Sequence, residues 1–204
     1  MDRRTFIAAG AASAISAAGV TVAGAATAPA SPAAPAATLA APPPAASDYV
    51  CNFAAVVPTV FPGGEIRSVT DATFPVLVGI SFAAVVLKPG AIRVPHWHSG
   101  NELALVTYGS TRFGMIVNGV GSEYSVKEGE TVFLPAGWVH YFENASRTKE
   151  ARLYFTYTDA AIKTYDLGAS LKTLSPDAVS HSLGITAAQL SAIPASQPKL
   201  RDAR

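Results

Sequence analysis

Short runs rich in β-branched and aromatic residues dominate the chain from residue 49 onward. Gly, Pro, Asn and Ser punctuate these runs, which cover residues 53–57, 76–87, 103–108, 112–117, 124–126, 131–134, 139–142 and 152–157. Many short strands separated by regular turns favour an antiparallel sandwich or barrel over a parallel sheet with crossover helices. The pattern therefore predicts an all-β domain over residues 49–174.

The pattern changes near the C-terminus, where two short helical signals follow each other. Ser175 can cap a helix with Pro176 at its first position, and Gly184 lies just past the expected end. Thr186 and Gln189 form a capping-box pattern for a second helix. Residues 175–204 are therefore predicted to form C-terminal helices and a tail.

An Ala/Gly/Ser-rich run follows Arg3 and Arg4 and reaches to about residue 28. A charged start, an apolar middle and a small-residue exit are typical of export signals. The arginine pair followed by Thr-Phe-Ile resembles a twin-arginine signal, which implies the twin-arginine export machinery as a partner and a periplasmic or extracellular location. An uncleaved anchor and a disordered basic start are the alternatives for residues 1–28. Residues 29–48 are rich in Ala and Pro and are predicted to form a disordered linker.

Charge and cysteine content narrow the classes of function. The formal net charge is +1, and removal of the predicted signal takes away two arginines and one aspartate, which leaves a neutral chain. A neutral chain argues against nucleic acid or an anionic membrane surface as a partner. Cys51 is the only cysteine. No intrachain disulfide can therefore form, and a metal site would have to do without paired thiolates.

Three of the four histidines lie between residues 90 and 144 and carry the candidate chemistry. His96 and His98 are two residues apart, so on a strand they point to the same side. Glu102 follows a turn-prone insert of three residues, and His140 must come from another strand that begins after a Pro-x-Gly turn. Three imidazoles and one carboxylate would leave two positions open in an octahedral metal shell, where a bidentate acid or dioxygen can bind.

The ligand set also limits the metal. Nitrogen and oxygen ligands without sulfur suit Mn(II) or Fe(II), while Zn and Cu compete through their higher raw affinity. Mn(II) and Fe(II) are therefore both candidate metals at this point, with O2 as a co-substrate or cofactor. The alternative interpretation of a His-x-His pair is two surface or aromatic-packing histidines without a ligand role.

The spacing around these residues is more specific than the ligand set alone. It resembles both consensus motifs of the cupin superfamily, as Gly90-x5-His96-x-His98-x3-Glu102-x6-Gly109 and Gly129-x5-Pro135-x-Gly137-x2-His140-x3-Asn144. The resemblance implies a jelly-roll β-barrel with the metal inside, in agreement with the strand pattern. It also implies a homo-oligomer, either a trimer or a hexamer.

Within the superfamily, residues 87–93 leading into His96 resemble the oxalate decarboxylase group, which is related to the germins. This resemblance implies a Mn-dependent enzyme that converts oxalate, or a similar small carboxylate, to formate and carbon dioxide. Arg93 would clamp the distal carboxylate of the substrate, because a guanidinium fork matches a carboxylate. An exposed arginine at the barrel rim is the alternative. The glutamate that the family carries on a lid has no counterpart in residues 158–164, so Asp159 is the predicted proton donor.

Two departures from this group keep other functions open. The bacterial decarboxylases have two cupin domains, whereas this chain shows one set of motifs, and the lid glutamate is missing. An oxalate oxidase that releases hydrogen peroxide is one alternative. A non-catalytic periplasmic cupin that binds a metal or a carboxylate is the other.

Overall fold

The computed structural model describes residues 46–194 and 198–203. The predicted export signal, residues 1–28, and nearly all of the predicted linker, residues 29–48, lie outside the described residues and stay predictions. At the end of the linker Ala46–Tyr49 forms the 3-10 helix η1, and Phe53–Ala55 forms a second one, η2. None of the described helices is long and apolar enough to span a membrane.

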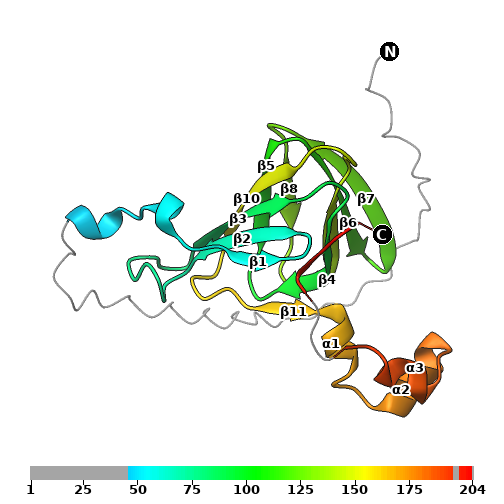
Figure 1. The fold of residues 1–204 in the computed structure, drawn as a ribbon. Helices are drawn as coiled ribbons and strands as arrows, with labels where there is room; N and C mark the ends of the chain where they lie inside the picture. The colour runs from blue at the N-terminus through cyan, green and yellow to red at the C-terminus, as the bar shows by residue number, and fades with distance from the viewer. Residues whose placement is uncertain (1–45, 195–197, 204) are drawn as a thin grey trace, which may run out of the picture. The chain divides into compact units, whose positions relative to one another are not determined.

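Two antiparallel sheets build the fold (Figure 1). The first contains, in spatial order, β1 (Thr59–Phe61), β2 (Gly64–Val69), β3 (Ser81–Leu87), β10 (Ala151–Tyr157), β5 (Glu102–Tyr108) and β8 (Thr131–Leu134). The second contains β11 (Thr164–Asp166), β4 (Ile92–His98), β9 (His140–Asn144), β6 (Ser110–Val117) and β7 (Val120–Lys127), and β12 (Leu200–Arg201) also pairs with β4. This jelly-roll arrangement confirms the predicted all-β fold class.

The core lies between the sheets because buried and outward-facing positions alternate along the strands. Every second residue of β3, β9 and β10 is buried. Phe113 and Phe142 of the second sheet are 5.1 Å apart between ring centroids, and Phe142 is 5.2 Å from Phe155 of the first sheet. These three buried rings join the two sheets. The ring centroid of Phe142 also lies 6.4 Å from that of His96. The aromatic core thus supports the side of the barrel that carries the histidines.

Several strand boundaries differ from the sequence prediction. Residues 53–57 contain η2 and no strand, and of residues 76–87 only Ser81–Leu87 are extended, since Gly79 takes a left-handed conformation with φ 67°. Residues 62 and 63 form the turn of a hairpin between β1 and β2, where Phe61 pairs with Gly64, and neither strand was predicted from the sequence. Strand β2 was missed because polar residues make up half of it, so it lacks an apolar run. Strands β11 and β12 were missed because three and two residues are too few to show a period.

Three short helices follow the barrel strands: α1 (Leu167–Leu171), α2 (Pro176–Leu183) and α3 (Ala187–Ser191). The capping box of α3 is present as predicted, with Thr186 and Gln189 bonding each other's backbone N–H groups. Ser175 occupies the N-cap position of α2 without a side-chain hydrogen bond, and Gly184 ends the helix with φ 64°. After these helices the chain returns to the barrel through β12, which the prediction of a free tail did not anticipate.

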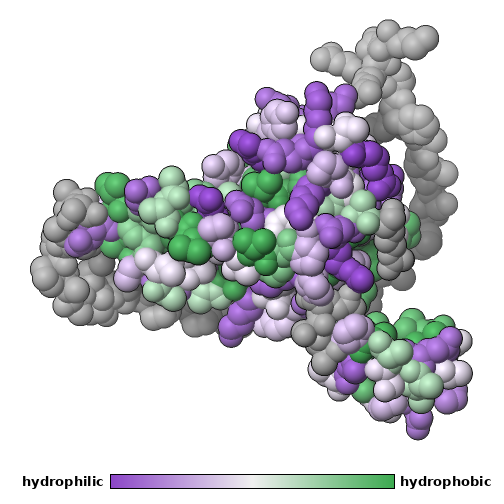
Figure 2. Space-filling model, in the orientation of Figure 1, coloured by the Kyte–Doolittle hydropathy of each residue, from purple (hydrophilic) through white to green (hydrophobic). Residues whose placement is uncertain are grey.

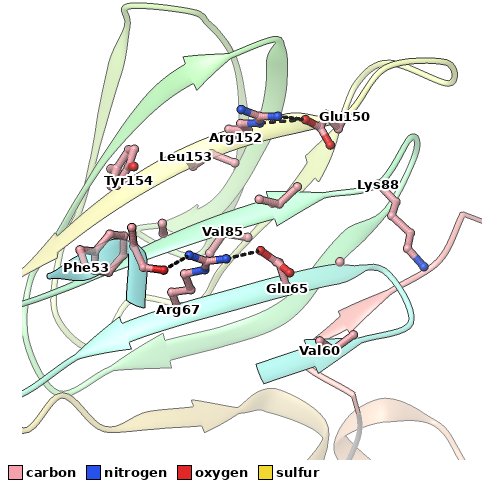
Figure 3. A pocket seen from close by; sticks show the side chains of 14 residues that line it. Phe53, Val60, Glu65, Arg67, Val85, Lys88, Glu150, Arg152, Leu153 and Tyr154 are labelled. Carbon is pink, nitrogen blue, oxygen red and sulfur yellow. Dashed lines mark hydrogen bonds and ion pairs between the residues drawn. The ribbon is translucent and has the colours of Figure 1, made fainter. Parts of the chain in front are cut away.

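The outer face of β2, β3 and β10 carries an open hollow of about 650 Å³ (Figure 3). Four of its five charged side chains are paired, because Arg67 lies 3.6 Å from Glu65 and Arg152 donates to Glu150 at 2.8 Å; the fifth is Lys88. Hydrophobic and hydrophilic residues are interspersed over the face shown in Figure 2. Within the described residues, the one group of three or more potential metal ligands lies elsewhere, inside the barrel.

Candidate metal centre

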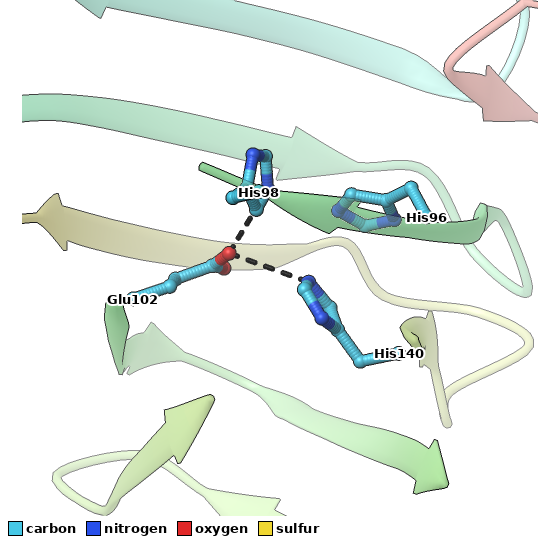
Figure 4. A group of neighbouring side chains, drawn as sticks. All are labelled: His96, His98, Glu102 and His140. Carbon is cyan, nitrogen blue, oxygen red and sulfur yellow. Dashed lines mark ion pairs between the residues drawn. The ribbon is translucent and has the colours of Figure 1, made fainter. Parts of the chain in front are cut away.

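The four predicted ligands converge inside the barrel from three strands (Figure 4). His96 and His98 come from β4, Glu102 opens β5 and His140 opens β9. Their ligand atoms all lie within 4.8 Å of one another, and all four residues are buried. The Oε2 atom of Glu102 is 3.0 Å from Nε2 of His98 and 3.3 Å from Nε2 of His140. The structure thus brings together the whole predicted ligand set.

Local structure explains why these four side chains meet. His96 and His98 share the inner face of β4, and His96 pairs directly with His140 across the β4–β9 ladder. Asn101, in the turn before Glu102, accepts a hydrogen bond from the N–H of Ala136 at 2.9 Å. Gly137 has φ 77°, which suits glycine, and its N–H donates to the carbonyl of His98 at 3.0 Å. The two motif turns are therefore tied to each other, and this fixes the start of β5 against the start of β9.

Backbone carbonyls orient the three imidazole rings. Nδ1 of His96 lies 2.7 Å from the carbonyl of Val94, and Nδ1 of His140 lies 2.9 Å from the carbonyl of Trp138. Nδ1 of His98 lies 3.3 Å from the carbonyl of Lys163. Because a carbonyl can only accept, each Nδ1 carries the proton and Nε2 is left as the ligand atom.

The electrostatics of the site fit a bound cation. Burial, helped by the charge of Arg93 and by the other two imidazoles, lowers the pKa of His96 well below its usual value, so its ring is neutral. Burial alone would raise the pKa of Glu102, but contacts with His140 and His98 outweigh it and lower this pKa to about 2. Oε2 of Glu102 and Nε2 of His140 are buried without a hydrogen-bond partner among the described residues. A cation between them would satisfy both atoms.

A cavity of about 240 Å³ adjoins the four residues and is lined from both sheets. Arg93 lines it together with His96, although regular alternation would place residues three apart on opposite faces of a strand. The register of β4 against β9 shifts between Arg93 and His96, which turns both side chains inward. This irregularity puts a guanidinium beside the candidate metal ligands.

Arg93 is 3% exposed, so it is not a surface arginine at the rim. Its Nη1 lies 3.2 Å from Oδ1 of Asp166 and also donates, at 3.4 Å each, to the carbonyls of Val94 and Lys199. Burial lowers the pKa of Arg93, and the carboxylate of Asp166 opposes this shift. The structure therefore places Arg93 on the cavity beside the candidate ligands, with a protein carboxylate already next to one nitrogen, and its role as a clamp stays a prediction.

Asp159 does not line this cavity. Its carboxylate accepts hydrogen bonds from the hydroxyl of Ser99 at 2.5 Å and from the N–H of Ala161 at 3.0 Å. These two bonds lower the pKa of Asp159 and so disfavour the protonated acid that a donor needs. In the structure Asp159 ties the loop after β10 to the loop after β4, and the predicted role as proton donor has no geometric support.

Sequence reasoning left several cavity-lining residues without a role, among them Tyr157, Thr164 and Lys199. Tyr157 is buried with its ring centroid 5.1 Å from that of His98, and burial raises the pKa of its phenol well above the usual value. Thr164 places its hydroxyl 3.1 Å from Nδ1 of His98. The alternation of β10 could have turned Tyr157 inward, but no sequence signal places Thr164 or Lys199.

Comparison with known proteins agrees with this geometry. A family model described as Cupin matches residues 58–191. The chain belongs to the cupin family. The match covers the strands that carry all four candidate ligands, so the motif resemblance is confirmed at the level of the family.

Among curated proteins, this cupin is similar to the oxalate decarboxylase OxdC of Bacillus subtilis, with 29% identity over 66% of this chain and 36% of the relative. It is also similar to a germin-like protein, subfamily 2 member 4, of Arabidopsis thaliana, with 30% identity over 53% of this chain and 50% of the relative. The cupin thus spans about half or less of the length of these relatives.

Among solved structures, oxalate decarboxylase is again similar to this cupin. Bacillus subtilis oxalate decarboxylase at pH 4.6 superposes with a TM-score of 0.68 and 25% identity, over 74% of this cupin and 40% of that chain. A further structure of that enzyme, with the same TM-score and identity, is described by its Mn(II) centres. The fold is therefore that of one part of the larger enzyme.

Proposed function

We propose that this cupin is a manganese-dependent enzyme that cleaves oxalate to formate and carbon dioxide. The observation that carries the proposal is the placement of Arg93 on a cavity of about 240 Å³ that is also lined by His96, His98 and Glu102, three of the four candidate metal ligands. The similarity to oxalate decarboxylases and to a structure described by its Mn(II) centres supports the substrate and the metal. When bound, manganese would supply Lewis-acid and redox chemistry to the substrate carboxylate.

The residues of the chain have distinct roles in this proposal. His96, His98 and His140 hold the metal through Nε2, and Glu102 holds it through its carboxylate. Arg93 binds the distal carboxylate of oxalate. All of its hydrogen bonds to described residues leave from Nη1, so Nε and Nη2 are the proposed donors to substrate. The apolar walls, which include Phe142 and Phe155, limit water in the cavity.

Proton supply separates this reaction from its alternative. Hydrogen oxalate gives formate and carbon dioxide only if a proton reaches the carbon that loses its partner. The hydrogen bonds of Asp159 disfavour it as that acid, whereas Tyr157 lines the cavity and keeps its proton at neutral pH. The position of Asp159 favours a second candidate, oxalate oxidase, in which oxalate is oxidised to two carbon dioxide molecules and dioxygen is reduced to hydrogen peroxide.

Product analysis of the full chain tests these functions. Manganese-loaded protein is incubated with oxalate, and formate and hydrogen peroxide are measured in parallel. Formate supports the decarboxylase and peroxide supports the oxidase. If the protein consumes neither oxalate nor any other short dicarboxylate, both enzyme functions are refuted, and a metal- or carboxylate-binding cupin remains.

Variants separate the roles of the side chains in the same assay. Arg93→Ala is expected to abolish turnover and leave manganese content unchanged, while Arg152→Ala, on the outer face of β10, serves as the matched control. Asp159→Asn tests the predicted donor: full formate production by this variant excludes a role for its carboxyl proton. Tyr157→Phe tests the phenol of Tyr157 as proton donor in the same way, because full formate production by this variant excludes a role for the phenolic proton.

Location and assembly are also proposed. We expect export through the twin-arginine machinery, which is tested by immunoblots of periplasmic and cytoplasmic fractions with and without substitution of Arg3 and Arg4. We expect a homo-oligomer, a trimer or a hexamer, which is tested by light scattering of the purified protein. A monomer at micromolar concentration would contradict the second expectation.

A further inference from the structure

The C-terminal strand β12 is fixed against the barrel close to the cavity. Leu200 pairs with Arg93 of β4, and its own side chain is fully buried in the core. The N–H of Gly63 donates to the carbonyl of Leu200 at 3.2 Å. A Cβ on Gly63 would come within 2.4 Å of the carbonyl oxygen of Arg201, so the turn between β1 and β2 can approach β12 only with glycine at this position. The backbone beside Lys199 is therefore held from two sides.

Lys199 directly precedes β12 and lines the same cavity as Arg93 and the candidate metal ligands. Its carbonyl accepts from the N–H of Val94 at 3.3 Å and from Nη1 of Arg93 at 3.4 Å. Lys199 is exposed as a whole residue, which places it at the mouth of the cavity. Two cationic residues from different parts of the chain therefore line one cavity, Arg93 in its buried part and Lys199 where it opens to solvent.

The charges around Lys199 are not balanced by the protein. Burial of the ammonium and the nearby charge of Arg93 lower the pKa of Lys199, and Asp166 opposes this shift. Asp166 already pairs with Arg93 at 3.2 Å. The ammonium of Lys199 makes no hydrogen bond or ion pair with any residue that the structure describes. A free cation at the mouth of a buried polar cavity is suited to an incoming anion.

We propose that Lys199 is a substrate-specificity residue that binds the second carboxylate of a dianionic substrate at the cavity mouth. The inference rests on the proposed function, because it assumes that a small dicarboxylate occupies the cavity. With one carboxylate at the metal, Arg93 and Lys199 provide a guanidinium and an ammonium for the other. A monocarboxylate has no group for Lys199 to bind, so this residue favours dicarboxylates over monocarboxylates.

Calorimetric titration of the manganese-loaded full chain with oxalate and with acetate tests this role. Lys199→Met is expected to raise the dissociation constant for oxalate about tenfold, the effect typical of one lost charge-assisted hydrogen bond, and to change that for acetate less than about twofold. Lys199→Arg should restore most of the oxalate affinity. Lys127→Met, an exposed lysine on β7 away from the cavity, is the matched control. In turnover assays Lys199→Met should raise KM more than it lowers kcat.

The outcomes are distinguishable. An unchanged oxalate affinity in Lys199→Met overturns the inference and leaves the proposed function standing. An equal loss for oxalate and acetate also overturns it, because a purely structural role would weaken both ligands. Failure of the unsubstituted, manganese-loaded protein to bind oxalate overturns both proposals at once. Manganese content and melting temperature, measured for every variant, verify that the compared proteins are folded and loaded.

Discussion

The ion pair between Arg93 and Asp166 gives a quantitative test of the electrostatics of the cavity. Its two side chains are 4% and 24% exposed, and Nη1 lies 3.2 Å from Oδ1. At an effective dielectric constant of about 20, this distance gives an attraction of roughly 5 kcal/mol before desolvation, which cancels much of it. The difference in exposure between the two partners makes the pair asymmetric. Asp166 can be hydrated without Arg93, whereas Arg93 without Asp166 is a buried and uncompensated charge.

Asp166→Asn is therefore expected to destabilise the folded protein more than Arg93→Met does. We expect Asp166→Asn to lower the free energy of unfolding by about 2 to 3 kcal/mol, below the cost of breaking a fully buried pair because Asp166 is partly hydrated. Arg93→Met removes the buried charge itself and should cost about 1 kcal/mol or less. The double variant should be no less stable than Asp166→Asn alone, because the unpaired charge is gone.

Urea denaturation of the metal-free protein at neutral pH, followed by circular dichroism, measures these differences. Glu150→Gln, which breaks the exposed pair with Arg152 on the outer face, is the control and should change stability by less than about 1 kcal/mol. An Arg93→Met variant that is less stable than Asp166→Asn would refute the reasoning. It would show that Arg93 contributes mainly through packing and that its charge is solvated from the cavity.

Three more predictions concern the metal ligands and the motif residues. Removal of metal by chelation should lower the melting temperature, and added Mn(II) should restore it in a concentration-dependent way, as scanning fluorimetry would show, but not in a His96→Ala variant. Asn144→Ala should lower the free energy of unfolding, measured by urea denaturation, by about 2 to 4 kcal/mol. The reason is that Nδ2 of Asn144 donates to the carbonyls of Leu87, Lys88 and Lys149 at 3.2, 3.0 and 2.7 Å. The control Asn118→Gly, at an exposed turn position with φ 51°, should leave the stability nearly unchanged. In the metal-free protein the pKa of Glu102 is lowered from 4.5 to about 2, so its contribution to stability is present above pH 4.5 and lost as the pH falls towards 2. The free energy of unfolding, measured by denaturation at several pH values in this range, should change less with pH in Glu102→Gln than in the unsubstituted protein. An equal change with pH in the two proteins would contradict the lowered pKa.

The four candidate ligands could be predicted from the sequence because their placement depends on local rules. The period of two along a strand turns His96 and His98 to one side, and the turn before His140 has a glycine that the backbone needs. Asn144, recognised only as a motif position, proves to fix the loop after β3 through its amide. For His96 and His98 the geometry is set within one strand, whereas Asn144 acts on a strand 57 residues away, so for Asn144 motif spacing gave the position without the contact.

The surroundings of the ligands could not be predicted in the same way. Arg93 reaches the cavity through a register shift in β4, and an irregularity of this kind leaves no period to detect. Its partner Asp166 belongs to a three-residue strand, and Lys199 precedes a two-residue strand. Both strands are defined by pairing with β4 across at least 66 residues of sequence, from His98 to Thr164 or further. Tertiary pairing, and not local propensity, places these charges.

The same distinction bears on the choice between decarboxylase and oxidase. Oxalate decarboxylases and germin-like proteins are both among the relatives of this cupin, so the similarity alone cannot decide the reaction. In the loop after β10, Asp159 is bonded to Ser99, and a Cβ on Gly100 would lie only 3.0 Å from the Cβ of Asp159. Any motion that carried Asp159 to the cavity would have to break that hydrogen bond and separate the two loops. Proton delivery by Asp159 would therefore require these two loops to separate.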